Sequence, residues 1–182
     1  MSKLNNEKIL SSKLLKYSSL SISLLLILFF LGCDYQEKAL EEKNKSLIIS
    51  MIEEGINKQN LEIFDELLSP DYVRYCQAMP PGLEEIKGIE TYKNFIKDHF
   101  IAFPDYKEEI QQIVAEGNKV SIITKGTATH TGPMGEIAPT NKKVIIMNFG
   151  IFRIKDGKIV EMWVSWDNVA FLRQLGLFPS SK

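Results

Sequence analysis

The chain has 182 residues, of which 45% are apolar and 25% are charged, and its 22 basic side chains nearly balance its 23 acidic ones. This length suits one domain, and the composition excludes intrinsic disorder, a collagen-like fibre and a disulfide-stapled mini-protein. A formal net charge of −1 provides no basic stripe of the kind that recognises phosphates. We therefore expect no nucleic-acid partner.

Residues 1–32 have the pattern of a secretory signal peptide. Lysines at positions 3, 8, 13 and 16 precede an uncharged, apolar run over residues 20–31. As a helix this run spans about 18 Å, which is too short for the ~30 Å hydrocarbon core of a bilayer. The segment Leu31-Gly32-Cys33 that closes it resembles the lipobox of bacterial lipoproteins, although Phe30 replaces the usual leucine. We expect Cys33 to carry a lipid that anchors the chain to a membrane outside the cytoplasm; an uncleaved signal anchor is the alternative.

The remaining cysteine and the two histidines predict neither a disulfide nor a metal site. With Cys33 lipidated, Cys76 has no partner for an internal disulfide. His99 and His130 are 31 positions apart, and no cluster has the spacing of metal ligands. Residues 34–45 are almost entirely polar. We expect residues 33–45 to form a tether and residues 46–182 to form the domain.

Helical periodicity opens the domain. Apolar residues at positions 47, 48, 51, 52 and 56 share one helical face. A short second helix is predicted over residues 61–68, with Asn60 as its N-cap, and a third over residues 89–102, ended by Pro104. Residues 72–76, between the last two, are rich in strand-forming side chains.

The apolar period then changes from 3.6 to 2, which predicts strands over 107–115, 119–131, 143–154 and 158–166. Tight turns at 116–118 and 155–157 favour antiparallel pairing, and a last helix is predicted over 168–175. Helices followed by a strand meander indicate the α+β class. The strands are apolar on both faces, so we expect helices on one and a partner subunit on the other. A sheet curved over helices would enclose a cavity for a small ligand.

From residue 71 onward, a series of short motifs is similar to the SnoaL-like polyketide cyclase, or ester cyclase, family of the nuclear-transport-factor-2-like superfamily. The resemblance covers about residues 45–178, and it rests on Phe103-Pro104-Asp105, Ala115–Val120, Gly126–Gly132, Pro139–Lys142, Phe152–Asp167 and Gln174-Leu175-Gly176. It implies a cone-shaped, curved antiparallel sheet packed on about three N-terminal helices, an apolar pocket and a homodimer.

The resemblance also implies a reaction. In the characterised cyclases an aspartate acts as acid and base in an intramolecular aldol ring closure that uses no metal or cofactor, and Asp167 has its place in the motif. His130 lies in the stretch that contributes a polar pocket residue. The sequence departs from the family at Tyr75, where many relatives have histidine, and at Asn141, where glycine is usual.

Elementary chemistry supports such roles. Burial raises the pKa of a carboxyl group, so an aspartate on an aromatic-lined strand can act as base and acid near neutrality. His130 would stabilise a developing enolate as a donor in a dry pocket. The expected pocket wall consists of Trp163, Tyr75, Tyr92 and Phe95. The alternatives are that Asp167 is an N-cap and that His130 is a structural hydrogen-bonding group.

Three functions fit these patterns. The first is a membrane-anchored, cofactor-free cyclase or isomerase acting on a small apolar carbonyl compound. The second is a non-catalytic module that binds a hydrophobic small molecule or a partner protein, which an extracytoplasmic anchor favours. The third, a hydrolase, would use Asp167 to activate water.

Overall fold

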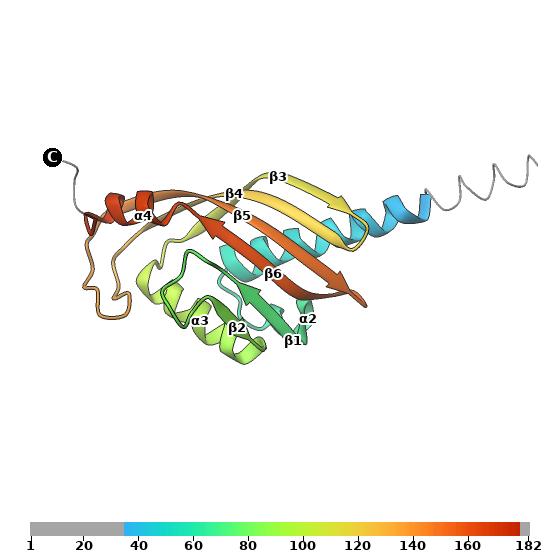
Figure 1. The fold of residues 1–182 in the computed structure, drawn as a ribbon, viewed down its shortest axis with the longest axis horizontal. Coiled ribbons are helices and arrows are strands. Elements are labelled where there is room, and N and C mark those ends of the chain that lie inside the picture. The colour runs from blue at the N-terminus through green and yellow to red at the C-terminus, as the bar shows by residue number, and fades with distance from the viewer. Residues whose placement is uncertain (1–34, 179–182) are drawn as a thin grey trace, which may run out of the picture. The chain divides into compact units, whose positions relative to one another are not determined.

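The computed structural model describes residues 35–178, so the signal peptide and Cys33 lie outside the described part. The chain forms two compact units, Met1–Leu40 and Glu41–Lys182, and the sheet and its helices belong to the second (Figure 1). Within residues 35–178, no helix has both the length and the apolar character needed to cross a membrane.

The first helix begins earlier than the predicted tether allows. Residues 35–50 are α-helical and continue directly into the π-helix η1 (Met51–Asn57). The apolar periodicity correctly identifies the buried face, where Met51, Ile52 and Ile56 are at most 4% exposed. The apolar spacing of residues 47–56 is that of an ordinary α-helix and does not indicate the change to π geometry. Such wide turns are often found at functional sites.

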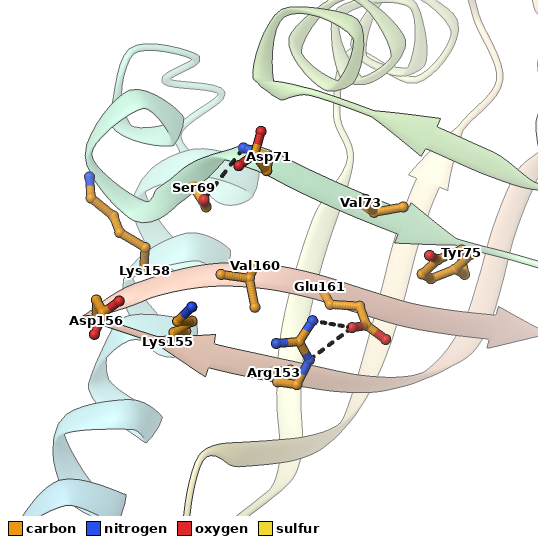
Figure 2. Close-up of a pocket in the computed structure, with 10 residues that line it drawn as sticks. All are labelled: Ser69, Asp71, Val73, Tyr75, Arg153, Lys155, Asp156, Lys158, Val160 and Glu161. Atoms are coloured by element: carbon orange, nitrogen blue, oxygen red, sulfur yellow. Dashed lines mark hydrogen bonds and ion pairs between the residues drawn. The ribbon is translucent and has the colours of Figure 1, made fainter.

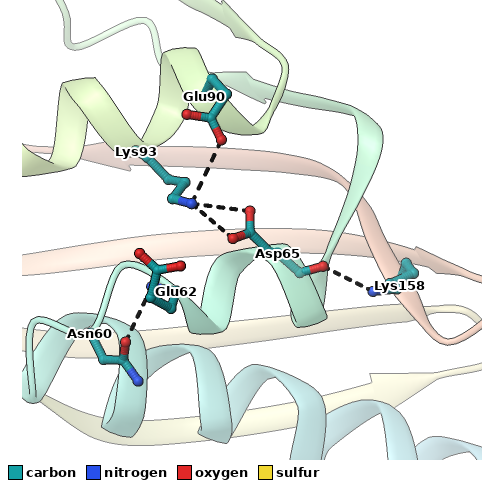
Figure 3. Close-up of polar contacts among 6 residues, drawn as sticks. All are labelled: Asn60, Glu62, Asp65, Glu90, Lys93 and Lys158. Atoms are coloured by element: carbon teal, nitrogen blue, oxygen red, sulfur yellow. Dashed lines mark hydrogen bonds and ion pairs between the residues drawn. The ribbon is translucent and has the colours of Figure 1, made fainter.

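Two further helices lie at or near their predicted positions. The N-cap of α2 (Ile63–Leu67) is Glu62 and not the predicted Asn60, because the helix begins two residues later than predicted. The Asn60 side chain instead accepts a hydrogen bond from the Glu62 N–H at 3.1 Å in the turn that precedes the helix. Helix α3 (Ile89–Ala102) has the predicted bounds. The two helices are joined by Lys93, whose Nζ lies 2.9 Å from Asp65 and 3.6 Å from Glu90 (Figure 3).

The six strands form one open, curled sheet in the order β2-β1-β6-β5-β4-β3. Their bounds are Leu68–Tyr75 (β1), Glu85–Lys87 (β2), Lys107–Glu116 (β3), Lys119–Thr129 (β4), Lys143–Lys155 (β5) and Lys158–Trp166 (β6). Helix α4 (Asn168–Leu175) follows β6 and ends at Gly176, whose φ of 74° is left-handed. The last four strands and α4 agree with their predicted positions to within two residues.

One pairing corrects the predicted antiparallel sheet. β1 pairs with β6 in parallel, whereas β3 to β6 form an antiparallel meander. Turn residues predict pairing only between strands that are consecutive in the sequence. β1 and β6 are separated by β2, α3 and β3 to β5, so no turn residue could indicate that they pair. β2 was not predicted, because a three-residue strand has too few positions to show alternation.

Strand alternation gives the sheet an inner face, which contacts η1, α2 and α3, and an outer face on the other side (Figure 1). On β5 both faces are apolar, as predicted, and Val144 and Phe152 are buried on the inner face. The outer-face set on the same strand is 41–54% exposed and consists of Ile145, Met147, Phe149 and Ile151.

Candidate functional site

Asp167 is exposed and lies at the N-terminus of α4. Its Oδ1 accepts a hydrogen bond from the Ala170 N–H at 2.8 Å, which is the geometry of an N-cap. The burial expected from its aromatic strand is therefore not found, because the chain leaves the sheet at this residue. The structure shows the capping role that the sequence left open, and the catalytic role stays a prediction.

His130 is completely buried just after β4. Its Nδ1 accepts a hydrogen bond from the Thr140 N–H at 3.2 Å, so in the neutral ring the proton is on Nε2. Nε2 is buried and has no hydrogen-bond partner among the described residues. Burial lowers the pKa of the ring. The Phe103 ring packs against it, with the two ring centroids 5.1 Å apart. Within residues 35–178 no hydrogen bond joins His130 to Asp167.

The predicted pocket wall is divided between the two faces of the sheet. Trp163 and Tyr75 stack with ring centroids 4.2 Å apart on the outer face, where Trp163 is 47% exposed and donates to Glu161 at 2.6 Å. Tyr92 and Phe95 lie on α3 against the inner face, with their ring centroids 6.4 Å apart. Strand alternation places Trp163 on the same face of β6 as Glu161, and Tyr75 on the same face of β1 as Val73. Glu161 and Val73 both lie on the outer face.

The outer face carries a pocket of about 400 Å³ at the β1–β6 pairing (Figure 2). It forms where β1 shifts register against β6 between Leu68 and Val73. Arg153 and Glu161 form an ion pair across its floor, with N–O distances of 2.5 and 2.8 Å. The lining is polar and charged, so this is not the apolar pocket that the sequence predicted.

Beneath the inner face lies a group of polar side chains that we call the polar cluster: Arg74, Tyr92, His99, Tyr106, Glu108, Thr124 and Asn148. His99 and Glu108 are half-buried and the others are buried. Four of them form its hydrogen-bonded half. The Tyr106 hydroxyl donates to Glu108 Oε1 at 2.5 Å. The Asn148 amide lies 3.2 Å from the Tyr106 hydroxyl, 3.3 Å from Glu108 and 3.3 Å from Thr124. Glu108 thus has a carboxyl group held by neutral donors, with no cation paired to it in the described part.

Burial raises the pKa of the Glu108 carboxyl, and hydrogen bonds from Tyr106 and Thr124 oppose the shift without reversing it. Burial and the Glu108 charge also raise the pKa of the Tyr106 hydroxyl, so Tyr106 remains a donor. A carboxyl group with a raised pKa is a stronger base when ionised and gives up its proton less readily when neutral. These are the properties that the sequence assigned to Asp167.

The other half of the cluster surrounds Arg74, which is 4% exposed and projects from β1 to the inner face. Its guanidinium lies over the Phe95 ring at 4.7 Å. Burial, with Arg74 as the second cause, lowers the pKa of His99 to about 4. His99 contacts Tyr106 edge-on at 4.5 Å, which connects the two halves of the cluster.

Two local features position Glu108. The side chain of Asn57, at the end of the π-helix, bonds both backbone groups of Glu108: its Oδ1 accepts the N–H at 2.7 Å and its Nδ2 donates to the carbonyl at 2.8 Å. Opposite, Gly126 leaves room for the Tyr106 hydroxyl, because a Cβ there would lie 3.0 Å from it. Asn57 therefore fixes the backbone of Glu108, and Gly126 leaves the space in which Tyr106 can bind the Glu108 carboxyl beneath the sheet.

Sequence reasoning missed the hydrogen-bonded half of the cluster. Two adjacent glutamates in a polar stretch are usually both solvated, but alternation along β3 places Glu108 and Glu109 on opposite faces, and only Glu109 is exposed. One sequence pattern could have indicated this: Glu108 is two residues from Ile110, so the two side chains point to the same face of the strand. Asn148 and Thr124 are opposite each other in the β4–β5 register, which the sequence alone does not give. Among residues 35–178 no cluster of three acidic, histidine or cysteine side chains can hold a metal ion.

A curled, open sheet over helices, with titratable side chains enclosed between them, is the architecture of the nuclear-transport-factor-2-like superfamily. Residues 46–175 match the SnoaL-like polyketide cyclase family. The chain therefore belongs to this family, and the resemblance found in its motifs is confirmed. A comparison with functionally curated proteins gave no match.

Several solved structures share the fold. A candidate SnoaL-like polyketide cyclase from Jannaschia sp. CCS1 is 21% identical with a TM-score of 0.69, over 76% of this chain and 95% of that one. AclR of Streptomyces galilaeus, a candidate hydroxylase, is 27% identical with a TM-score of 0.67, over 78% and 90%. IdmH of Streptomyces antibioticus, a candidate polyketide cyclase, is 29% identical with a TM-score of 0.63, over 73% and 98%. Because one fold can host many unrelated reactions, the shared fold alone does not fix the reaction of this chain.

Proposed function

We propose that this protein is a cofactor-free acid–base enzyme that enolises, and then cyclises or isomerises, a small carbonyl compound with an apolar body. The observation that carries the proposal is the enclosed Glu108 carboxyl, held by the Tyr106 hydroxyl at 2.5 Å under the sheet of a SnoaL-like domain. A base of this kind needs no metal.

The chemistry is a proton cycle. Ionised Glu108 removes a proton from the carbon beside the substrate carbonyl, which leaves an enolate and a neutral Glu108. Attack of the enolate carbon on a second carbonyl forms the new bond and an alkoxide, and Glu108 returns its proton to that oxygen. An isomerase would instead return the proton to a different carbon. Tyr106 and Asn148 orient the carboxyl throughout.

The test follows the first step alone, because the natural substrate is unidentified. Ethyl 2-methylacetoacetate in D₂O exchanges its α-hydrogen for deuterium, and proton NMR follows this exchange. We expect the wild-type protein to accelerate it, and Glu108→Gln to lower the acceleration by about 10²-fold or more, as for loss of a general base. Glu109→Gln, on the exposed face of the same strand, is the matched control and should retain the wild-type rate.

A binding module is the second candidate, and the exposure of Asp167 favours it, since the residue that the family resemblance made catalytic caps a helix. The same experiment separates the two. If wild-type protein, Glu108→Gln and Glu109→Gln all leave the exchange at the rate of buffer, the enzyme proposal is wrong and the binding module is favoured.

We further propose, from the sequence, that Cys33 carries the lipid that holds the domain at a membrane outside the cytoplasm. In a bacterial host, wild-type protein should incorporate a fatty-acid analogue, and Cys33→Ala should accumulate as an unlabelled, longer precursor. Cys76→Ala removes the only other cysteine and is the control. Normal processing of Cys33→Ala would refute the anchor.

A further inference from the structure

Arg74 is a buried cation without a counter-ion among the described residues. It is 4% exposed, its Nη1 is buried and has no hydrogen-bond partner in residues 35–178, and none of the ion pairs found there includes it. Burying a charge is costly unless it is paired and hydrogen-bonded. A fold that keeps such a group unpaired leaves a strong binding site for an anion.

The neighbours of Arg74 do not supply the missing charge. Burial raises the pKa of Tyr72 and of Tyr92, so both hydroxyl groups are neutral. His99, with its pKa lowered to about 4, is neutral at pH 7. Glu108 is bonded to Tyr106 and Thr124 instead. Within residues 35–178 the guanidinium lies over the face of Phe95, and its Nη1 is left without a hydrogen-bond partner.

The surroundings define what kind of anion fits. Tyr72, Tyr92 and Phe95 form a row of aromatic rings beside Arg74, with successive centroids 5.2 and 6.4 Å apart. Such rings favour an apolar or aromatic ligand body, while a planar guanidinium matches a carboxylate with two parallel hydrogen bonds. The Tyr92 hydroxyl, whose pKa is raised by burial, keeps its proton and is a further potential donor in this row.

We propose that the Arg74 guanidinium binds the carboxylate of the ligand, so that the ligand class is an oxo acid with an apolar or aromatic body. This inference deepens the proposed function, on which it rests for the carbonyl group. The aromatic row would hold the body between Arg74 and the hydrogen-bonded half of the cluster, with the carbonyl compound's acidic C–H facing Glu108. An uncharged carbonyl compound would lack the group that pairs with Arg74.

The test measures binding, so that it is independent of turnover. The probes are 4-oxo-4-phenylbutanoate and its methyl ester, titrated calorimetrically into the full domain. We expect the acid to bind at least about tenfold more tightly than the ester, since a hydrogen bond to a charged group is worth this much or more. Arg74→Met should abolish this preference, and Arg74→Lys should retain a part of it.

Arg173 provides a matched control, because it also stacks on a phenylalanine, with its guanidinium 5.4 Å from the Phe178 ring, but is exposed. Arg173→Met should keep the preference for the acid. Thermal unfolding separates binding from a structural role: without ligand, Arg74→Met should be at least as stable as wild type, because it removes an unpaired buried charge.

Equal affinity of acid and ester for the wild-type protein, or a stable Arg74→Met variant that still prefers the acid, would overturn the proposal. A marked loss of stability in Arg74→Met without ligand would also contradict it, since the guanidinium would then be structural. Absence of α-hydrogen exchange together with a clear preference for the acid would refute the proposed enzyme and leave the anion site intact.

Discussion

Glu108 and Glu109 are neighbours with the same side chain, and the sheet gives them opposite surroundings. Glu108 faces the helices and is held by Tyr106 and Thr124, whereas Glu109 is exposed. The reactivity that we assign to Glu108 therefore comes from its position on the strand and not from its residue type. Asp167 lies just beyond the end of β6 and is exposed, and its carboxyl caps α4 instead.

His99 makes stability depend on pH in a definite direction. Its pKa is about 4 in the folded protein and about 6.5 in an unfolded chain. Because the folded value is lower, the neutral ring stabilises the fold above pH 6.5, and this contribution is lost as the pH falls through 4. We expect a loss of about 3 kcal/mol in the free energy of unfolding across this interval.

Urea unfolding of wild type and His99→Phe between pH 4 and 8 tests this expectation. The variant keeps an aromatic ring and should lose most of the dependence. The remaining slope comes from His130, whose pKa is also lowered by burial, and from carboxyl groups with shifted pKa values, of which Glu108 is raised and Glu161 is lowered. Identical slopes for His99→Phe and wild type would contradict the assignment.

At the scale of elements, the π-helix η1 matters because its last residue holds β3. Asn57 bonds the N–H and the carbonyl of Glu108 at 2.7 and 2.8 Å, so one amide side chain fixes where the candidate base lies. A helix that ended in regular α geometry would present a different side chain to this strand.

Asn57→Ala should destabilise the domain by about 1–3 kcal/mol, since it removes two hydrogen bonds and leaves backbone groups without partners. Asn57→Asp keeps the acceptor and should lose less. Chemical denaturation measures both, and the exchange reaction should slow in Asn57→Ala even where the protein is fully folded. Unchanged stability and rate in Asn57→Ala would show that Asn57 does not position Glu108.

Element positions were predictable where the signal is local. Helix α3 has an apolar face and a terminating proline, and β5 and β6 alternate and are joined by Asp156-Gly157, both with positive φ; all three were found. The parallel β1–β6 pair, the π turn and the depth of Arg74 and Glu108 depend on contacts between distant segments, which a periodicity cannot report. Asn141, at a family glycine position, has a φ of 56°, so the left-handed turn itself is retained.

For the whole molecule, the outer face of the sheet is the main unexplained surface. Its exposed apolar side chains lie on adjacent strands and include Phe149, 54% exposed, and Trp163, 47% exposed. Contiguous apolar patches of this kind mark interaction sites. We propose that a second copy of the chain covers this face, as the two-sided apolar pattern predicted, because two equivalent sheet faces can pack on each other around a two-fold axis.

Sedimentation of the domain should then show a dimer that Phe149→Glu converts to a monomer, since the substitution buries two charges at the interface. Ile101→Glu is the control: Ile101 is 50% exposed on α3, away from the outer face, and its variant should remain dimeric. A wild-type protein that is monomeric at every concentration up to about 100 µM, where even weak specific dimers associate, would contradict this arrangement.

The most direct test of the account compares two titrations: the ¹³C NMR signal of the Glu108 carboxyl, assigned with Glu108→Gln, and the pH dependence of the deuterium exchange. We predict that the carboxyl titrates above the ordinary glutamate range and that the exchange rate rises with pH through that same pKa. Glu108→Gln should remove this inflection. A Glu108 signal that titrates at or below the ordinary value, or an inflection that persists in Glu108→Gln, would contradict a base enclosed beneath the sheet.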